Sequence, residues 1–399
     1  MREALITEFG ASPAREDNAA FIQQAIDSLP GGRVVIPPGV YRSSGLRLKS
    51  GLQLILESGA VLKASADLSR YPVRGMFDSG TKEMRTFLSA EGCADLSIQG
   101  PGTIDASGDA FFDFSFTDED RALYGDGVRE TPARCRERLS HPIYFSDCEN
   151  VRLRELTIVN SPCWTVTLNR CRGVKIRDVD ISTGMRIPNS DGVHISGSQD
   201  VEITGCTLRC GDDCVAVTSI LDSSAVSRNV LISHCILSSS SSAIRVRHLD
   251  ARVENVLISG CIIENANRGI AIFAGDGGVV EAVKVSGCIL RTRILEGGWW
   301  GKGEAVVVCS KNSSGRISDV SFRDLTVETE NQLIFAGNVE NCTLDGCSIR
   351  IKDSPRRKFA RQYDIAPNGT LDRKNDFQGP FCIDLDQNCV LRVNGEPAE

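Results

Sequence analysis

Four near-copies of one phrase decide the fold: QDVEITGCTL at 199–208, RNVLISHCIL at 228–237, ENVLISGCII at 254–263 and EAVKVSGCIL at 281–290. Each copy starts at a turn and then alternates apolar and polar residues, which is the pattern of a short β-strand. Looser copies begin at 149, 172 and 318, and the shared valine recurs at steps of 23 to 29 residues followed by one of 37. Repetition at such a period indicates a solenoid.

A unit of this size cannot bury its own apolar face, so neighbouring units must stack and share one core. No helical periodicity fills the gaps between the strand-like runs, which argues against βαβ units. We therefore predict an all-β fold, a single-stranded right-handed parallel β-helix with coils about 4.8 Å apart. The long step of 37 residues predicts an insertion at 291–303.

The open end of such a coil exposes a sheet edge, which needs a cover. Residues 17–29 are predicted to form an N-terminal capping helix that begins at Asp17 or Asn18. Its apolar face consists of Phe21, Ile22, Ala25, Ile26 and Leu29. We predict one domain over 1–399, with the cap at about 1–32, the coils at about 33–350 and a C-terminal tail or cap at about 351–399.

Composition excludes several classes of protein. The formal charge of −7, from 52 acidic and 45 basic residues, is not that of a nucleic-acid binder. No run of about 18 apolar residues occurs, so no membrane span is expected. The N-terminus lacks the apolar core of a secretory signal, which predicts a cytosolic location. Nothing in the sequence predicts an oligomeric state.

The 16 cysteines are interpreted as buried, reduced thiols. Cys206, Cys235, Cys261 and Cys288 each recur at the same place in a repeat. A ladder of this kind is explained by small apolar side chains in a core. No His completes a zinc ligand set near Cys210 and Cys214, so no metal or other cofactor is predicted.

The stretch between Pro188 and Val217 contains three aspartates that the predicted fold brings together. Asp191 and Asp212 lie 21 residues apart, which is close to one coil. Aligning Val193 with Val215 puts Asp191 and Asp213 in the same slot of adjacent coils, with Asp212 one residue earlier. Carboxylates this close cannot all ionise, so one should keep its proton near neutral pH. An acid beside a base is what glycoside hydrolysis needs.

Alternation predicts which side chains face these aspartates. The inward set is Val193, Ile195, Val215, Val217, Ile244, Val246, Ile270 and Ile272. The predicted outward stripe and its neighbours supply the candidate substrate-binding residues, namely His194, Arg245, Arg247 and Arg268, together with Trp299 and Trp300 of the insertion. Arginines beside the acidic trio suit a hydroxyl-rich or anionic ligand. As alternatives, the arginines pair with nearby aspartates, the tryptophans pack the insertion onto the coil, and the Asp-Asp pair is only a turn.

These residues resemble the polygalacturonase family, glycoside hydrolase family 28, over roughly residues 5–330. The N-terminal FGASPAREDNAAFIQQAIDSLPGGRVVIPPGVY is shared among pectinase-like β-helices. More specific motifs are GPGTIDASG at 100, NSPCWTV at 160, PNSDGVHI at 188 and CGDDCVAV at 210. The resemblance implies that Asp212 is the general acid, that Asp191 and Asp213 hold and activate water, and that hydrolysis inverts configuration without a metal.

Two family motifs are missing. Where the family has Gly-His-Gly, this chain has Ser241-Ser242-Ala243, and where it has Arg-Ile-Lys, the strand reads Ile270-Ala271-Ile272-Phe273. The expected function is therefore a glycosidase acting on an oligosaccharide whose sugar stays open, neutral or charged. A polysaccharide lyase with Ca²⁺ and an arginine base, a cyclising glycosyl transferase, and a non-catalytic carbohydrate-binding β-helix remain as alternatives.

Overall fold

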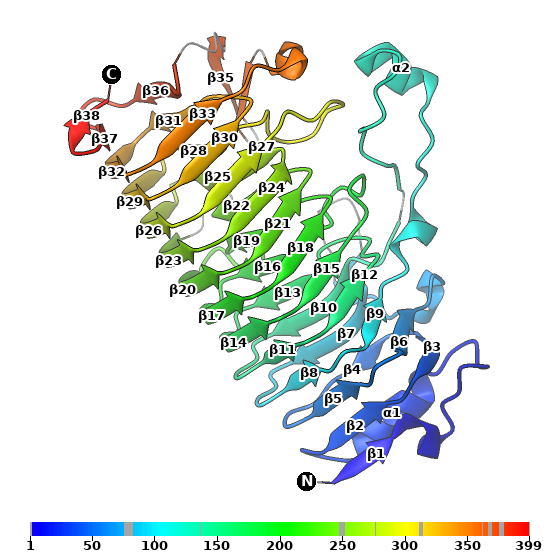
Figure 1. Ribbon diagram of the computed structural model, residues 1–399. Helices are drawn as coiled ribbons and strands as arrows, with labels where there is room; N and C mark the ends of the chain where they lie inside the picture. The colour runs from blue at the N-terminus through cyan, green and yellow to red at the C-terminus, as the bar shows by residue number, and fades with distance from the viewer. Residues whose placement is uncertain are drawn as a thin grey trace.

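The computed structural model is a single coil of short parallel strands that stack along one axis (Figure 1). It describes residues 2–75, 83–135, 137–246, 252–275, 277–310, 314–360, 362–365, 369–374 and 379–398. The described strands form three long sheets, one with 14 strands and two with 11. Each turn of the chain adds one strand to each sheet, which confirms the predicted right-handed parallel β-helix.

The first sheet contains β1 (Glu3–Leu5), β2 (Arg33–Ile36), β5 (Gln53–Leu56), β8 (Ser97–Gln99), β11 (Arg152–Arg154), β14 (Arg172–Arg177), β17 (Gln199–Thr204), β20 (Val226–Ser233), β23 (Arg252–Ser259), β26 (Val279–Ser286), β29 (Arg316–Arg323), β32 (Val339–Asp345), β37 (Leu391–Val393) and β38 (Glu396–Pro397). The second sheet, which carries the candidate site, contains β4 (Leu46–Arg47), β7 (Thr86–Glu91), β10 (His141–Ser146), β13 (Val166–Asn169), β16 (Val193–Ser196), β19 (Val215–Thr218), β22 (Ser242–Val246), β25 (Arg268–Phe273), β28 (Val306–Cys309), β31 (Leu333–Gly337) and β36 (Phe381–Leu385).

The third sheet contains β3 (Gly39–Ser43), β6 (Ala60–Ala64), β9 (Thr103–Asp105), β12 (Thr157–Val159), β15 (Asp180–Ser182), β18 (Thr207–Cys210), β21 (Ile236–Ser239), β24 (Ile262–Ala266), β27 (Ile289–Thr292), β30 (Thr326–Thr329) and β33 (Ser348–Ile351). A separate antiparallel hairpin joins β34 (Gln362–Ile365) to β35 (Gly369–Lys374). The helices are α1 (Ala19–Ser28), α2 (Asp118–Tyr124) and the 3₁₀ turns Ile6–Phe9, Leu68–Arg70, Gly108–Phe111 and Pro355–Phe359.

The recurring Asn-Val or Asp-Val pair has a conformational cause. Asp200, Asn229 and Asn255 have φ angles of 57°, 56° and 56°, a left-handed region that Asn and Asp tolerate better than most residues. Their side chains also bond in a ladder, since Asn229 Nδ2 donates to Asp200 Oδ1 at 2.8 Å and Asn255 Nδ2 donates to Asn229 Oδ1 at 3.2 Å. The turn residue thus fixes the register in which the following valines stack in the core.

The cysteine and cap predictions are confirmed. All 16 cysteines are free thiols, and the predicted ladder Cys206, Cys235, Cys261 and Cys288 is buried. The helix α1 follows Asn18 and buries Ile22, Ala25 and Ile26 over the first coils. Within the described residues, no helix is long and apolar enough to cross a membrane.

The C-terminal boundary differs from the prediction. Residues 351–399 were expected to form a tail or cap, but β36 pairs with β31 and β37 pairs with β32, so the coils continue to about residue 393. The apolar runs that form these strands are only three to five residues long. A polar segment separates them from the last clear repeat, which hides them from a search for periodicity.

An arm leaves the coils between β9 and β10 and carries α2 (Figure 1). It contacts the insertion at 291–303, because Arg293 Nη1 lies 3.2 Å from Glu130 Oε1 and the Trp299 indole donates to the Glu130 carbonyl. It also contacts the loop before Asp191, because Arg186 donates to the carbonyls of Thr131 at 2.8 Å and Phe114 at 3.0 Å. The arm therefore forms a wall alongside several coils.

Candidate active site

The three aspartates lie where two adjacent coils enter the second sheet. Strand β16 pairs with β19 so that Val193 faces Val215, and this register confirms that Asp191 and Asp213 occupy one slot of neighbouring coils. The ladder also continues through the aspartates, since Gly192 N donates to the Asp213 carbonyl at 2.9 Å. The backbone that carries the carboxylates is therefore part of the rigid sheet.

Two glycines explain the local sequence. A Cβ on Gly192 would lie 2.5 Å from the Cys214 carbonyl oxygen, and one on Gly211 would lie 2.3 Å from the Ile187 carbonyl oxygen. Neither distance is sterically possible, so only glycine lets the two loops approach this closely. The Asp-Gly of one coil and the Gly-Asp-Asp of the next are thus packing requirements that bring the carboxylates together.

Asp212 and Asp213 have different partners. Asp212 accepts hydrogen bonds from the backbone N–H of Asn189 at 3.0 Å and of Asp213 at 2.9 Å. Asp213 forms an ion pair with Arg245 and accepts from Ser242 N at 3.1 Å and Ser241 Oγ at 3.3 Å. The serines that stand where the family has Gly-His-Gly therefore hold Asp213. Arg245 is thus the cationic partner of Asp213.

Asp191 is bonded to His194. The distance from Asp191 Oδ2 to His194 Nδ1 is 2.8 Å, and His194 Nε2 lies 3.1 Å from Thr218 Oγ1. The indole of Trp164 stacks on the imidazole, with ring centroids 3.5 Å apart and planes 15° apart. His194 faces the aspartates as predicted, but it is fully buried, so it contacts Asp191 instead of presenting a free edge to a ligand.

Burial shifts the protonation equilibria of Asp191 and Asp212. Asp191, Asp212 and Asp213 expose only 2%, 4% and 1% of their surface. Burial raises the pKa of Asp212 well above its usual range, and the charges of Asp191 and Asp213 raise it further. Burial likewise raises the pKa of Asp191, with a further contribution from Asp213. Two carboxyl groups of the cluster thus have a raised pKa, and the third, Asp213, is paired with the Arg245 guanidinium.

The other predicted binding residues lie in different surroundings. Arg245 keeps 15% of its side chain exposed, and Arg247 lies outside the described residues. Arg268 occupies the Asp191 slot two coils beyond Asp213. There it is buried with Glu304, at 3.5 Å from Nε to Oε2.

The two tryptophans of the insertion also differ. Trp299 is 5% exposed and bonds the arm, which is the packing alternative, whereas Trp300 is 44% exposed. Trp300 is thus the one with a ring surface open to solvent.

The outward face beyond the aspartates is apolar and covered. Ala271 and Phe273, at the positions where the family has cations, belong to a buried cluster separate from the main core. Val307 and Ile334 continue this cluster on the next two coils and are fully buried. Ala271 and Phe273 therefore point away from the main core and are buried in this second cluster.

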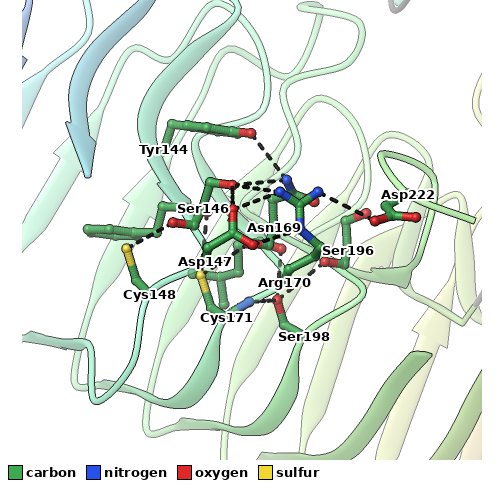
Figure 2. A network of polar contacts seen from close by, with 12 residues as sticks. Tyr144, Ser146, Asp147, Cys148, Asn169, Arg170, Cys171, Ser196, Ser198 and Asp222 are labelled. Carbon is green, nitrogen blue, oxygen red and sulfur yellow. Dashed lines mark hydrogen bonds and ion pairs between the residues drawn. The ribbon is translucent and has the colours of Figure 1, made fainter. Parts of the chain in front are cut away.

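The opposite ends of β10, β13 and β16 carry a second polar network (Figure 2). Arg170 binds Asp147 through two contacts of 2.7 Å and reaches Asp222 at 3.5 Å. Ser196 Oγ accepts from Leu221 N at 2.9 Å. These bonds fasten the loop that contains Ile220 and Leu221, and both side chains pack against the cluster of Cys163 and Trp164. The network therefore holds a cover over the Trp164–His194 stack.

Sequence reasoning missed the arm and the residue that links it to the aspartates. Arg138 is almost fully buried, and it donates to the Pro188 carbonyl at 2.7 Å and to Asn189 Oδ1 at 2.9 Å. Asn189 in turn holds Asp212. A cavity of about 890 Å³ opens beside these residues, with Phe111, Asp113 and Arg134 among its other lining residues. The one available signal was the length of chain between residues 105 and 141, which exceeds a coil.

Carboxylates are also the ligands that hard metal ions prefer. Across the described ranges, no group of three or more His, Cys, Asp or Glu side chains has an arrangement that would hold a metal ion.

The parallel β-helix and the buried cluster of three aspartates on its second sheet point to a class, the β-helical carbohydrate-active proteins. Sequence comparison narrows it, because a family model described as "Glycosyl hydrolases family 28" matches residues 34–356. The chain belongs to this family and is a polygalacturonase-like glycosidase.

Similar curated proteins agree with this assignment. A probable polygalacturonase of Vitis vinifera is 25% identical over 353 residues, which cover 82% of this chain and 68% of that protein. An endo-polygalacturonase of Pectobacterium carotovorum subsp. carotovorum is 23% identical over 332 residues and 79% of each chain. A polygalacturonase of Juniperus ashei is 34% identical over 137 residues, only 25% of that protein.

Solved structures share the fold. The family 28 exopolygalacturonase of Yersinia enterocolitica superposes with a TM-score of 0.68 at 16% identity and covers all of this chain and 79% of its own. The polygalacturonase of Erwinia carotovora ssp. carotovora has a TM-score of 0.67 at 20% identity, with coverage of 85% and 91%. At these identities the likeness concerns the fold.

Proposed function

We propose that the protein hydrolyses glycosidic bonds of pectin-related oligosaccharides with inversion of configuration. In this proposal Asp212 is the general acid, and Asp191 and Asp213 hold the attacking water. The observation that carries it is the division of the cluster into a carboxyl whose pKa is raised, Asp212, and a carboxylate bound to an arginine, Asp213. Inverting hydrolysis needs this combination of one acid and one base.

The proton balance of the reaction is simple. Asp212 gives its proton to the oxygen of the leaving sugar as the glycosidic bond breaks. Asp213 takes a proton from the water that attacks the opposite face of the ring. Each contribution of this kind is worth about 10²- to 10⁴-fold in rate. Arg245 orients Asp213 and is the one charged partner of the trio with a partly exposed side chain.

The substrate class rests on the relatives and on the shape of the site. Proteins similar to this chain are named polygalacturonases, and Arg245 offers a cation for an acidic sugar. The covered apolar face beyond Asp213 leaves little room for a long polymer, so we propose short oligosaccharides cleaved from one end. Such substrates also suit a cytosolic enzyme, and 16 free thiols fit a reducing compartment.

Substrate contact by Trp300 has a direct test with a matched control. Trp300→Ala is expected to raise KM several-fold, because the loss of stacking on a sugar ring weakens substrate binding by about 1 kcal/mol. The melting temperature should not fall. Trp299→Ala should lower the melting temperature, because this residue joins the insertion to the arm. An unchanged KM in Trp300→Ala would remove Trp300 from the substrate site.

The test of the function is a product assay over pectic and neutral oligosaccharides of increasing length, with and without chelator. The expected products sum to the substrate plus one water, and chelator leaves the rate unchanged. An unsaturated product that forms only with Ca²⁺ would favour a lyase, and a cyclic product would favour glycosyl transfer. Binding without turnover on every sugar would favour a carbohydrate-binding scaffold. Any of these three outcomes would contradict the proposal.

A further inference from the structure

His194 is the buried titratable group of the site to which the reaction above gives no part. Its ring lies between Asp191 and Thr218 and under Trp164. A neutral imidazole carries its proton on either Nδ1 or Nε2, and the partners decide which. The partner of Nδ1 is the Asp191 carboxyl group, which can either donate or accept a proton. Which nitrogen carries the proton is therefore decided by Thr218, the partner of Nε2.

The hydroxyl group of Thr218 has one proton and two lone pairs. Three groups surround its oxygen: the Ile195 carbonyl at 3.0 Å, Ile220 N at 3.3 Å and His194 Nε2 at 3.1 Å. The carbonyl only accepts, so it takes the hydroxyl proton, and the amide only donates, so it takes one lone pair. The second lone pair is left for a proton on His194 Nε2. If the hydroxyl group instead donated to His194 Nε2, Thr218 Oγ1 and the Ile195 carbonyl oxygen would lie 3.0 Å apart with no proton between them.

A neutral ring protonated at Nε2 presents a lone pair at Nδ1. The contact of 2.8 Å between Nδ1 and Asp191 Oδ2 then needs a proton from the carboxyl group. We propose that His194 is a positioning residue that keeps Asp191 protonated, so that Asp213 is the single carboxylate of the cluster and the base of the reaction. This inference rests on the proposed function, since it assigns the roles within that site.

The charges around the pair support the assignment. The charges of Asp213 and Asp212 disfavour a further negative charge on Asp191, whereas Arg245 and Arg138 act in the opposite direction. The balance raises the pKa of Asp191, chiefly through burial. Burial lowers the pKa of His194, and Arg245 lowers it further.

Both directions place the proton on the carboxyl group and keep the ring neutral. His141, which lies nearby on Trp164, is itself held neutral because burial lowers its pKa to about 3. Within the trio, one carboxylate is then left, and it is paired with the Arg245 guanidinium.

This arrangement sharpens the mechanism. A protonated Asp191 orients the attacking water through its second oxygen, Oδ1, but does not take the proton from it. Asp213 alone takes that proton. The cover of Ile220 and Leu221 keeps bulk water from the His194 ring, so the proton between Asp191 and His194 stays in place through the turnover.

The test is the tautomer of His194, measured by nitrogen NMR on protein labelled with ¹⁵N-histidine. The chain has four histidines, and the resonances that vanish in His194→Gln identify the residue. The expected spectrum shows a protonated Nε2 and an unprotonated Nδ1 across the pH range of activity. A protonated Nδ1, alone or together with Nε2, would overturn the inference, because Asp191 would then accept a proton from the ring instead of donating one to it.

A variant pair adds a kinetic readout. Thr218→Val removes the acceptor for Nε2–H, so we expect the tautomer to switch and kcat to fall at least about 10-fold with little change in KM. Thr218→Ser keeps the hydroxyl group and should restore the tautomer and most of the lost kcat. A Thr218→Val protein that keeps the wild-type tautomer and kcat would contradict the role of Thr218.

The two proposals fail separately. The tautomer is measured without substrate, so an Nε2–H ring in a protein that hydrolyses no sugar would refute the function and leave the assignment intact. An active hydrolase with an Nδ1–H ring would refute the assignment alone.

Discussion

Replacing Asp212 by Asn removes a proton donor and changes little else in shape. If Asp212 protonates the leaving oxygen, kcat should fall by about 10²- to 10⁴-fold, the usual contribution of a general acid. The structure also predicts a cost in stability. Both carboxyl oxygens of Asp212 accept backbone N–H groups, and the amide of Asn offers one acceptor where two are needed. One buried donor loses its partner, which costs about 1–3 kcal/mol.

The assay compares turnover and urea unfolding of the wild type, Asp212→Asn and a matched control. Asp17 is a suitable control for the substitution because its carboxylate also accepts two backbone N–H groups, both at Oδ1, from Ala19 at 2.9 Å and Ser44 at 3.0 Å, in the N-terminal cap far from the trio. The amide oxygen of Asn can accept both of these bonds, so Asp17→Asn should keep its kcat and lose less stability than Asp212→Asn. An Asp212→Asn protein that folds and retains a rate within about 3-fold of wild type, against the 10²-fold expected at least, would refute the role of Asp212.

Three further predictions concern stability. The raised pKa values of Asp191 and Asp212 mean that the folded protein holds protons which the unfolded chain releases near pH 3.9. This stabilisation is complete below that pH and is lost as the pH rises through the folded-state pKa. The free energy of urea unfolding should therefore fall with increasing pH, and its slope against pH should be shallower in Asp212→Asn. An equal slope in the two proteins would contradict the raised pKa of Asp212. Arg245→Gln leaves Asp213 buried without its cation and should lower the free energy of unfolding, measured in the same urea experiment, by about 3–5 kcal/mol. A loss below about 1 kcal/mol would instead indicate that Asp213 lies in a more polar environment than its burial suggests. Ala282 occupies the turn position of the Asn ladder with φ of 58°, so Ala282→Asn should raise the melting temperature through a gain of about 1 kcal/mol, and a lower melting temperature would contradict the strain argument.

The register of the aspartates was predictable because strand alternation and coil length act together. One alternating run fixes which residues face the core, and a coil of nearly constant length fixes which residues share a slot. The alignment of Val193 with Val215 therefore places Asp191 and Asp213 in one column from the sequence alone, and the observed pairing agrees.

The parts that escaped prediction are those where the period breaks. The arm at 106–140 follows no repeat, so its contact with Asp212 through Arg138 and Asn189 is a matter of tertiary packing. The insertion at 291–303 interrupts the count of residues per coil, which concealed that Glu304 occupies the slot after Arg268. The burial of His194 depends on the Ile220 loop, whose side chains carry no periodic signal.

The central claim is a single displacement by water between an acid and a base carboxylate. Its most direct test is the configuration of the first sugar product, followed by proton NMR within the first minutes of hydrolysis, before the anomers equilibrate. The account predicts that the new reducing end first appears with the configuration opposite to that of the cleaved bond. A product that first appears with the original configuration would require a covalent intermediate and would contradict the roles given to Asp191, Asp212 and Asp213.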